Sequence, residues 1–511
     1  MKKNIINIML TISLILSMII TPVFAEPDSE TDVITSVSAI ESDNLQGDES
    51  EVTEPDTSSL FNDYVLVGLK YGSSAENSFD IYSENGFIIA DIIDGVVTPV
   101  VTGIDFDTLT LFSENGVVSV AGNDISILYD LGYRIVLPAD YDTGGVFEFN
   151  DNPYRGGIAA TLNSDGTINL INAINIDHYV YGVLDSEMYH DNPLEALKAQ
   201  AVAARSFSRV NEGRHSSYGF DLCTGTHCQV YKGYSDEHDE TNKAVDETAG
   251  LCIYYEDEPV SAYYFKNSGG HTQNIKDVWG SSRGYLVGVK DEFCPDYPWT
   301  VTYSFSEISS KLKSAGTDIG TLEKIEIASR NEAGAVDTLK FTGTSGTATL
   351  SKERIRTFFG STIIKSTMFS FKDSVTDDNG SDDSDIEPIT SVSGNLSVLG
   401  AGGQVSDINL KDVYVIGAGN NVVKQDLMKL LVTDGSNIVY ASAFIDENDD
   451  IDDKEPVVNV SEYVTSGEVT FVGKGYGHGI GMPQDSAIEM AKQGFAFDEI
   501  LQYYYTGVEI K

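Results

Sequence analysis

The chain has 511 residues, of which 41% are hydrophobic, and its 32 Lys and Arg stand against 79 Asp and Glu, a formal net charge of −47. This length predicts about two to four domains with enough apolar material for a hydrophobic core. The large negative charge argues against nucleic acids and anionic membrane surfaces as partners.

The N-terminus has the pattern of an export signal. Lys2 and Lys3 precede an apolar run over residues 8–20, and Val23-Phe-Ala25 offers small residues for cleavage. We expect residues 1–25 to be a signal peptide cleaved after Ala25. The alternative is an uncleaved membrane anchor, because an apolar run of about 20 residues can span a bilayer. Either way, the protein is expected to be exported.

Composition divides the rest of the chain. Residues 26–63 contain no Lys or Arg and are rich in Asp, Glu, Ser and Thr, which predicts a disordered acidic leader. Short apolar runs between turn residues then predict β structure. The further segments are an N-terminal β module (64–151), a core (152–372), an acidic linker (373–388), an inserted β module (389–463) and a C-terminal part that completes the core (464–511).

The core is organised around a helix predicted over residues 194–210. Asn192 suits the N-cap, Pro193 suits the first helical position, and Glu195 would complete a capping box. The helix is apolar on nearly every side, so we expect it to be buried. The predicted fold class is therefore α+β, with β-rich modules around a buried central helix and a small β module inserted near the C-terminus.

Two cations fall on one narrow stripe of this helix, Lys198 and Arg205. Buried cations are costly unless a carboxylate or a ligand meets them. Glu187, five residues before the predicted cap, is a candidate close in sequence. Structural ion pairs and contacts with a ligand are both open readings of these two residues.

Near the C-terminus, every second residue from Gly473 to Gly481 is glycine. In an extended strand this spacing leaves one face bare, so that another backbone or a ligand can approach closely. His478 lies on the other face. It either lines a site or is a packed ring that is hydrogen-bonded within a turn.

Four cysteines are present, and in an exported chain they raise the expectation of disulfides. Their spacing alone does not choose between bridges and a metal site. They are Cys223, Cys228, Cys252 and Cys294.

Several separated blocks carry the motifs of the chain: Tyr181-Gly-Val-Leu-Asp-Ser-Glu-Met188, Pro193-Leu-Glu-Ala-Leu-Lys-Ala-Gln-Ala-Val-Ala-Ala-Arg205, Cys223-Thr-Gly-Thr-His-Cys-Gln-Val-Tyr231, Asn267-Ser-Gly-Gly270 with Trp279-Gly280, and Gly475-Tyr-Gly-His-Gly-Ile-Gly-Met-Pro-Gln484. In this order they resemble the signature of the stage II sporulation protein D and amidase-enhancer family. The resemblance covers roughly residues 65–371 and 469–511.

The resemblance implies an extracellular or wall-associated lytic transglycosylase. Such enzymes cleave peptidoglycan glycan strands between N-acetylmuramic acid and N-acetylglucosamine and leave a 1,6-anhydro end. In sporulation members, the substrate is glycan already stripped of its peptides. The catalytic glutamate of the family maps onto Glu187.

One acid suffices for this reaction. A hydrolase needs two carboxylates, whereas a transglycosylase can use the 6-hydroxyl of its substrate as the nucleophile. A single Glu187 can then donate a proton to the leaving oxygen and accept one from that hydroxyl. This role needs a raised pKa, which burial supplies. Nearby Lys198 and Arg205 would lower that pKa, so we expect the two cations to position the loop or to bind substrate oxygens.

The other substrate contacts expected from the resemblance are side chains that suit sugar rings and hydroxyls, together with the glycine-rich segment. With Lys198 and Arg205, they are Gln229, Tyr231, Tyr264, Lys266, Ser268, Gly477, His478 and Gln484.

Some members of the family carry zinc at the Cys/His loop, and the residues that match here are His215, Cys223, His227 and Cys228. Two thiolates and two imidazoles suit a tetrahedral ion, and a site with all four positions filled would be structural. No other cofactor is expected. A Cys223–Cys228 disulfide is the alternative.

Two segments depart from the family pattern, Tyr189-His-Asp-Asn192 and Met482-Pro-Gln-Asp-Ser486. Both flank the expected site, so they bear on substrate preference. The competing function is a non-catalytic wall-binding protein that enhances an N-acetylmuramoyl-L-alanine amidase. A third reading, an adhesin-like β protein, conflicts with the helical core. The expected partners are glycan strands and, for the enhancer, a wall amidase. Sporulation and general wall turnover both fit the sequence.

Overall fold

The computed structural model describes residues 63–93, 95–122, 129–372, 374–377, 461–465 and 467–511, with short strands between residues 396 and 440. The predicted signal peptide, the leader before residue 63 and most of the linker and inserted module lie outside the described residues. None of the described helices is long and apolar enough to cross a bilayer.

Two sheets in the N-terminal half share one hydrophobic core that includes Ile81, Phe87, Leu111 and Leu170. The seven-stranded sheet has the order β13 (Leu222–Cys223), β1 (Tyr64–Lys70), β12 (Ile168–Asn175), β11 (Gly157–Leu162), β8 (Ile135–Pro138), β3 (Phe87–Ile93) and β4 (Val96–Ile104). The six-stranded sheet has the order β10 (Asn152–Tyr154), β9 (Phe147–Phe149), β2 (Ser78–Tyr82), β5 (Thr108–Glu114), β6 (Val117–Gly122) and β7 (Tyr129–Asp130). Both sheets contain strands from each side of the predicted boundary at residue 151.

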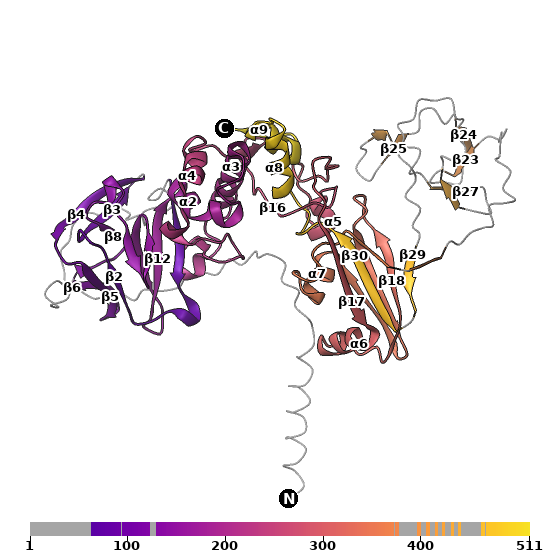
Figure 1. Cartoon of the computed structure of the whole chain (residues 1–511), viewed down its shortest axis with the longest axis horizontal. Helices are drawn as coiled ribbons and strands as arrows, with labels where there is room; N and C mark the ends of the chain where they lie inside the picture. The colour runs from indigo at the N-terminus through magenta and orange to yellow at the C-terminus, as the bar shows by residue number, and fades with distance from the viewer. Residues whose placement is uncertain are drawn as a thin grey trace, which may run out of the picture. The chain divides into compact units, whose positions relative to one another are not determined.

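Three helices follow strand β12 in the chain (Figure 1). Helix α2 (Ile176–Glu187) starts directly after β12, and Asn175 caps it by accepting a hydrogen bond from the Asp177 N–H. Helix α3 (Leu194–Val210) is buried at every residue from Ala199 to Ser208, as expected of the central helix. Helix α4 (Asp239–Asp246) packs against both. The last turn of α2 therefore emerges from a rigid, buried assembly.

The predicted cap of α3 is wrong. The N-cap is Pro193, with φ −55° and ψ 138° and without a side-chain cap bond. The Asn192 amide instead donates to the main-chain oxygen of Tyr189. Glu195 pairs with Lys198 and accepts a hydrogen bond from the Phe497 N–H. A local turn thus occupies the Asn192 side chain, and Lys198 together with the distant Phe497 main chain occupies Glu195.

The C-terminal half has its own core, centred on residues such as Ile325, Phe341 and Phe471. One sheet consists of β17 (Pro298–Ser304), β30 (Glu468–Lys474) and β21 (Phe369–Phe371). Another consists of β20 (Gly346–Ser351), β19 (Val336–Gly343), β18 (Leu322–Arg330), β29 (Ser461–Val464) and β22 (Val375–Asp377). Helices α6 (Phe305–Ser314) and α7 (Glu353–Phe359) pack in this core, whereas α5 (Ile275–Trp279) contributes Ile275 and Val278 to the core around α3.

Within the segment 389–463, the structure describes three hairpins before β29. They are β23 (Leu396–Leu399) with β24 (Val405–Ile408), β25 (Tyr414–Ile416) with β26 (Val422–Lys424), and β27 (Leu431–Thr433) with β28 (Ile438–Tyr440).

The end of the chain returns to the central helix. Helices α8 (Gln484–Lys492) and α9 (Phe497–Tyr504) pack on α3, and Ala487 and Leu501 share a core with Val202. Three short strands lie beside them, β14 (Ile253–Tyr255), β15 (Glu258–Pro259) and β32 (Glu509–Ile510). Strand β31 (Met482–Pro483) pairs in parallel with β16 (Tyr264–Phe265). The mixed α+β class predicted from the sequence is confirmed.

The sequence predicted an extended strand over the glycine segment, and the structure shows that only its beginning is extended. Strand β30 ends at Lys474, and the glycines at 475, 477, 479 and 481 have φ of 81°, 132°, 85° and 76°. Residues other than glycine rarely adopt such φ values. The protein itself also occupies the expected bare face, since a Cβ at Gly477 would lie 2.6 Å from the Cβ of Phe265. These glycines allow a tightly turned segment to pack closely.

Candidate active site at the end of helix α2

Glu187 is the last residue of α2 and is partly exposed. Burial is the largest influence on its carboxyl group and raises its pKa. Three hydrogen-bond donors act in the opposite direction, namely the Tyr264 side chain, the Val230 main chain and the Gln484 side chain. The net result is a raised pKa, so this carboxyl group keeps its proton to higher pH than a free glutamate.

The hydroxyl of Tyr264 is oriented by a buried amide. Gln229 Nε2 donates to the Tyr264 oxygen at 3.0 Å. Gln229 Oε1 accepts from Ser208 Oγ at 2.8 Å and from the Tyr179 hydroxyl at 3.3 Å. Because the Tyr264 oxygen receives the amide proton, its own hydrogen is free to point at Glu187. The chain Ser208–Gln229–Tyr264 therefore prepares a donor for the carboxylate.

Gln484 reaches the same place from the end of the chain. Its Nε2 donates to the main-chain oxygen of Glu187 at 2.9 Å, and its side chain also interacts with the carboxyl group. The Gln484 amide further lies 3.5 Å from Gln200 Oε1 on α3. Strand β31 and helix α8 are thereby attached to the end of α2.

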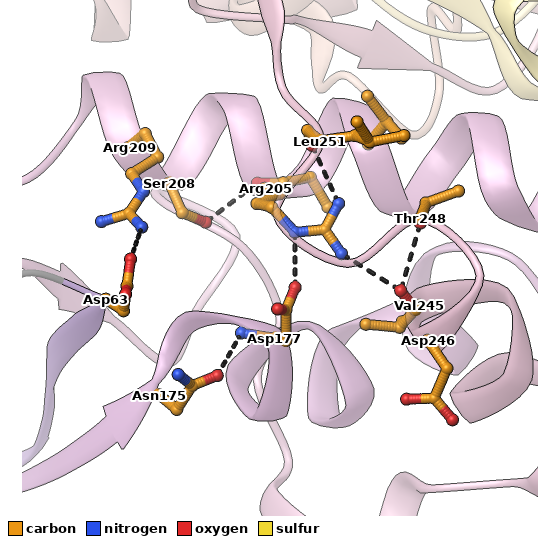
Figure 2. Close-up of polar contacts among 12 residues, drawn as sticks. Asp63, Asn175, Asp177, Arg205, Ser208, Arg209, Val245, Asp246, Thr248 and Leu251 are labelled. Atoms are coloured by element: carbon orange, nitrogen blue, oxygen red, sulfur yellow. Dashed lines mark hydrogen bonds and ion pairs between the residues drawn. The ribbon is translucent and has the colours of Figure 1, made fainter. Parts of the chain in front are cut away.

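The sequence left open whether Arg205 and Lys198 form structural ion pairs or contact a ligand. In the structure, both form ion pairs within the protein. Arg205 Nε binds Asp177 Oδ1 at 2.6 Å, and its guanidinium also donates to the main-chain oxygen of Leu251 at 3.0 Å (Figure 2). The Arg205 side chain is 1% exposed. Lys198 pairs with Glu195 at 2.8 Å and Glu247 at 2.7 Å. Both cations thus have acidic partners other than Glu187, and neither is among the influences on its pKa.

Several of the expected substrate contacts are buried within the protein. The Tyr231 hydroxyl donates to Asn172 Oδ1, and Ser268 Oγ donates to Asp291 Oδ2. Gln229 is 2% exposed. The Gly477 N–H donates to the main-chain oxygen of Lys365. These groups already have partners in the fold.

Lys266 is the accessible member of the expected set. Its side chain is 48% exposed and pairs with Asp485 at 2.7 Å. Lys266 is two residues beyond Tyr264, and Asp485 follows Gln484. Successive side chains of an extended segment alternate between its faces, so Tyr264 and Lys266 share one face. The structure thus brings Glu187, Tyr264, Lys266 and Gln484 into one neighbourhood.

His478 is a packed ring. Phe265 and Trp279 lie with ring centroids 5.4 Å and 5.2 Å from it, and its Nδ1 accepts the Ile480 N–H at 3.0 Å. Burial, the largest cause, lowers its pKa to about 3, so the imidazole is neutral at physiological pH. A hydrogen bond to the Tyr264 main chain places His478 behind that residue.

The four Cys/His residues of the loop come together. Their ligand atoms all lie within 4.8 Å of one another. Cys228 Sγ is 3.4 Å from His215 Nε2 and 3.6 Å from His227 Nδ1, and Cys223 Sγ is 3.8 Å from His227 Nδ1. A tetrahedral zinc ion with ordinary bond lengths separates sulfur from nitrogen by about 3.6 Å. The donor set therefore fits zinc.

The protonation chemistry of the cluster is also compatible with a metal. Burial lowers the pKa of His215 and of His227, which favours the neutral imidazoles that bind metals. Burial raises the pKa of the Cys228 thiol to about 11, and a bound cation would offset this by favouring the thiolate. All four cysteines are free thiols in the structure.

Sequence reasoning missed the contribution of Val230, whose main chain contacts the Glu187 carboxyl group. A main-chain contact carries no signal in residue type. It also assigned Gln229 to the substrate, whereas the structure uses Gln229 to orient Tyr264. The Gln229 side chain gave no indication of that partner, because Tyr264 is 35 residues away in sequence.

Two family models match parts of the chain, and one of them includes Glu187. Residues 164–255 match the family model of stage II sporulation protein, and residues 271–383 match a domain of unknown function. The first match contains Glu187 and the four Cys/His residues. Tyr264 and Gln484 lie beyond it.

Among relatives, the amidase enhancer of Bacillus subtilis (strain 168) is 28% identical over 331 residues, which are 64% of this chain and 40% of that protein. Stage II sporulation protein D of Bacillus amyloliquefaciens is 34% identical over 165 residues, 28% of this chain and 48% of that protein. An uncharacterized protein of Brachyspira hyodysenteriae is 30% identical over 238 residues, 44% of this chain and 64% of that protein.

The chain thus spans between 40% and 64% of the length of these relatives. The matches confirm the resemblance predicted from the sequence motifs. Residues 164–255 match the stage II sporulation protein model, and the chain has homologues named amidase enhancer and stage II sporulation protein D.

Proposed function

We propose that the protein is an exported, wall-associated lytic transglycosylase that cleaves peptidoglycan glycan strands, with Glu187 as its single acid and base. The environment of Glu187 carries the proposal, because burial raises its pKa while three donors stand ready for the carboxylate. Among the described residues, no second carboxylate is a main influence on the pKa of Glu187, and the neighbouring Asp485 is paired with Lys266. This arrangement suits a reaction that needs one acid rather than two.

The first step is proton donation. Protonated Glu187 gives its proton to the glycosidic oxygen that leaves, and the bond from that oxygen to C1 of the N-acetylmuramic acid breaks. The carboxylate that forms accepts hydrogen bonds from the Tyr264 hydroxyl, the Val230 N–H and the Gln484 amide. These donors are in place beforehand, so they stabilise the developing charge without reorganisation.

The second step returns the proton. The 6-hydroxyl of the same sugar attacks C1, and its proton passes to the Glu187 carboxylate. One glycosidic bond is exchanged for the 1,6-anhydro bond, and no water is consumed. Glu187 ends protonated, ready for another turnover.

The residues expected to bind substrate divide into two roles in this proposal. Lys266, which is exposed beside the site, contacts sugar hydroxyls. The side chains of Tyr264 and Gln484 serve Glu187. The buried residues position the site through the contacts that they make within the fold, and they are Arg205, Gln229, Tyr231, Ser268 and His478.

We also propose that His215, Cys223, His227 and Cys228 hold a structural zinc ion. Such an ion would supply binding energy that fixes the loop between α3 and η5 (Gly233–Asp236), and with four protein ligands it leaves no open position for substrate. The Gln229 that orients Tyr264 directly follows Cys228.

The test is digestion of peptide-stripped glycan strands, followed by mass spectrometry of the products. The wild-type protein should release anhydro-ended sugars, and Glu187→Gln should release at least a hundredfold less. Glu212→Gln is the matched control, because burial also raises the pKa of Glu212, which pairs with Arg209 at the other end of α3. Full activity of Glu187→Gln would remove Glu187 from the mechanism.

A second function rests on a specific observation, the similarity to an amidase enhancer over 64% of this chain. In that case the protein binds the wall and stimulates an N-acetylmuramoyl-L-alanine amidase without cleaving glycan. Stimulation that is equal for wild type and Glu187→Gln, with no anhydro product from either, would identify the enhancer. Loss of product in Glu187→Gln alone identifies the enzyme.

A further inference from the structure

A cluster that the proposed function leaves unused lies at the end of α2. Asp185 is in the last turn of that helix, His190 follows it, and His238 is the N-cap of α4. Their ligand atoms lie within 4.8 Å of one another. These residues are separate from the Cys/His loop, and the chemistry proposed for Glu187 does not require them.

Asp185 is a carboxylate fixed in place. Its side chain is 8% exposed. Its Oδ1 accepts the His190 N–H at 2.7 Å and lies 2.8 Å from His190 Nδ1, while its Oδ2 lies 3.7 Å from His238 Nε2. In the part of the chain that the structure describes, its ion-pair partners are these two imidazoles. A buried carboxylate requires a nearby positive charge.

The two imidazoles are near one another and accessible. Their ring centroids are 3.8 Å apart with planes inclined at 22°, and the side chains of His190 and His238 are 36% and 41% exposed. With this exposure, small rotations of either ring meet little packing resistance. A carboxylate and two neutral imidazoles form a common set of ligands for a divalent transition metal.

We propose that Asp185, His190 and His238 bind a divalent transition-metal ion through Oδ2, Nδ1 and Nε2. His190 Nδ1 lies 2.8 Å from Oδ1 of this carboxylate and His238 Nε2 lies 3.7 Å from its Oδ2. These two distances lie on either side of the separation of about 3.3 Å between two ligands of a tetrahedral ion. The Asp185 Oδ1 keeps the His190 N–H as its partner, which holds the carboxylate in orientation.

This site differs in chemistry from the Cys/His loop. It offers nitrogen and oxygen ligands without thiolate, and three protein ligands leave a position open to water or a small ligand. It therefore binds its ion more weakly and exchanges it more readily than a closed Cys2His2 site. A bound ion would link the end of α2, which carries Glu187, to the start of α4.

The test is titration of the purified full-length protein with Co²⁺, followed by calorimetry and electronic absorption. Thiolate ligands give charge-transfer absorption with Co²⁺, whereas nitrogen and oxygen ligands do not, so the two sites are counted separately. The wild type should bind one Co²⁺ without charge-transfer absorption. His190→Asn and His238→Asn should each weaken that binding at least tenfold. His178→Asn, a change on α2 outside the cluster, should leave it unchanged.

The proposal would be overturned if all Co²⁺ bound by the wild type gave charge-transfer absorption. It would also be overturned if His190→Asn and His238→Asn bound Co²⁺ as tightly as the wild type. The wild-type protein gives a second readout that does not depend on how the variants fold. Co²⁺ should broaden the ring resonances of His190 and His238 more strongly than those of His178. Sharp resonances for His190 and His238 at saturation would equally exclude the ion.

Discussion

At Glu187, burial and hydrogen bonding act against each other on one carboxyl group. Burial prevails and raises the pKa, although three donors favour the charged form. This balance suits a residue that must first give a proton and then exist briefly as an anion. An unbonded buried glutamate would hold its proton too firmly, and an exposed one would lose it before substrate arrived.

Tyr264→Phe tests this balance. Removing the hydroxyl takes away a donor that favours the carboxylate, so the pKa of Glu187 should rise further. Activity that depends on protonated Glu187 declines as the pH rises through that pKa, so the alkaline limb of the pH–rate profile should move to higher pH. A hydrogen bond to a charged group contributes about 1.5–3 kcal/mol, so kcat should fall about ten- to a hundredfold.

The profile is measured as kcat against pH on peptide-stripped glycan. Tyr263→Phe is the control, because the neighbouring Tyr263 ring packs against Trp279 and Phe207. A limb that stays in place or moves to lower pH in Tyr264→Phe would show that this hydroxyl does not stabilise the Glu187 carboxylate.

The sequence indicates Glu187 by its motif, but not the partners that define its chemistry. Tyr264, Val230 and Gln484 come from three other segments, and Gln484 is 297 residues from Glu187. Local pattern cannot predict a contact over that separation. The same reason explains why Asp185, His190 and His238 escaped notice, since His238 comes from a different helix.

At the scale of elements, the two cations on one face of helix α3 lie in different electrostatic environments. Arg205 is enclosed, with Asp177 and two main-chain oxygens around its guanidinium (Figure 2). Lys198 lies near the surface, where the side chains of Glu195 and Glu247 are 33% and 40% exposed. The stripe was evident from the sequence. The identity of its partners depended on where α2 and α4 pack.

Replacing each cation by methionine should separate the two environments. Arg205→Met leaves the Asp177 carboxylate and the Leu251 carbonyl without the buried guanidinium, so the free energy of unfolding should fall by about 3 kcal/mol. Lys198→Met breaks pairs that water screens and should cost less than about 1 kcal/mol. Urea unfolding measures both. A substrate role would appear instead as lost glycan cleavage by a variant of unchanged stability.

The glycine segment shows a second limit of local reading. Alternate glycines were evident, and they correctly indicated close approach of another group. The expectation of an extended strand failed because the positive φ of Gly475 to Gly481 turns the chain. The group that approaches is the protein itself, for instance Phe265 against Gly477. A glycine pattern indicates space, but not what fills it.

At the scale of the molecule, the site depends on the return of the chain end to its middle. Helices α8 and α9 pack on α3, and strand β31 pairs with β16, so that Gln484 and Tyr264 flank Glu187. The separate motifs and the α+β class could be predicted from the sequence. The pairing between segments could not, because both hydrophobic burial and strand pairing are satisfied only in the complete fold.

The central claim is that one carboxylic acid acts together with a hydroxyl of the substrate and without water. It is tested most directly by digesting peptide-stripped glycan in H2¹⁸O and weighing the new ends by mass spectrometry. The account predicts anhydro ends that contain no ¹⁸O, and none of them from Glu187→Gln. New ends that are reducing rather than anhydro, formed in proportion to the cleavage, would show hydrolysis and would contradict it.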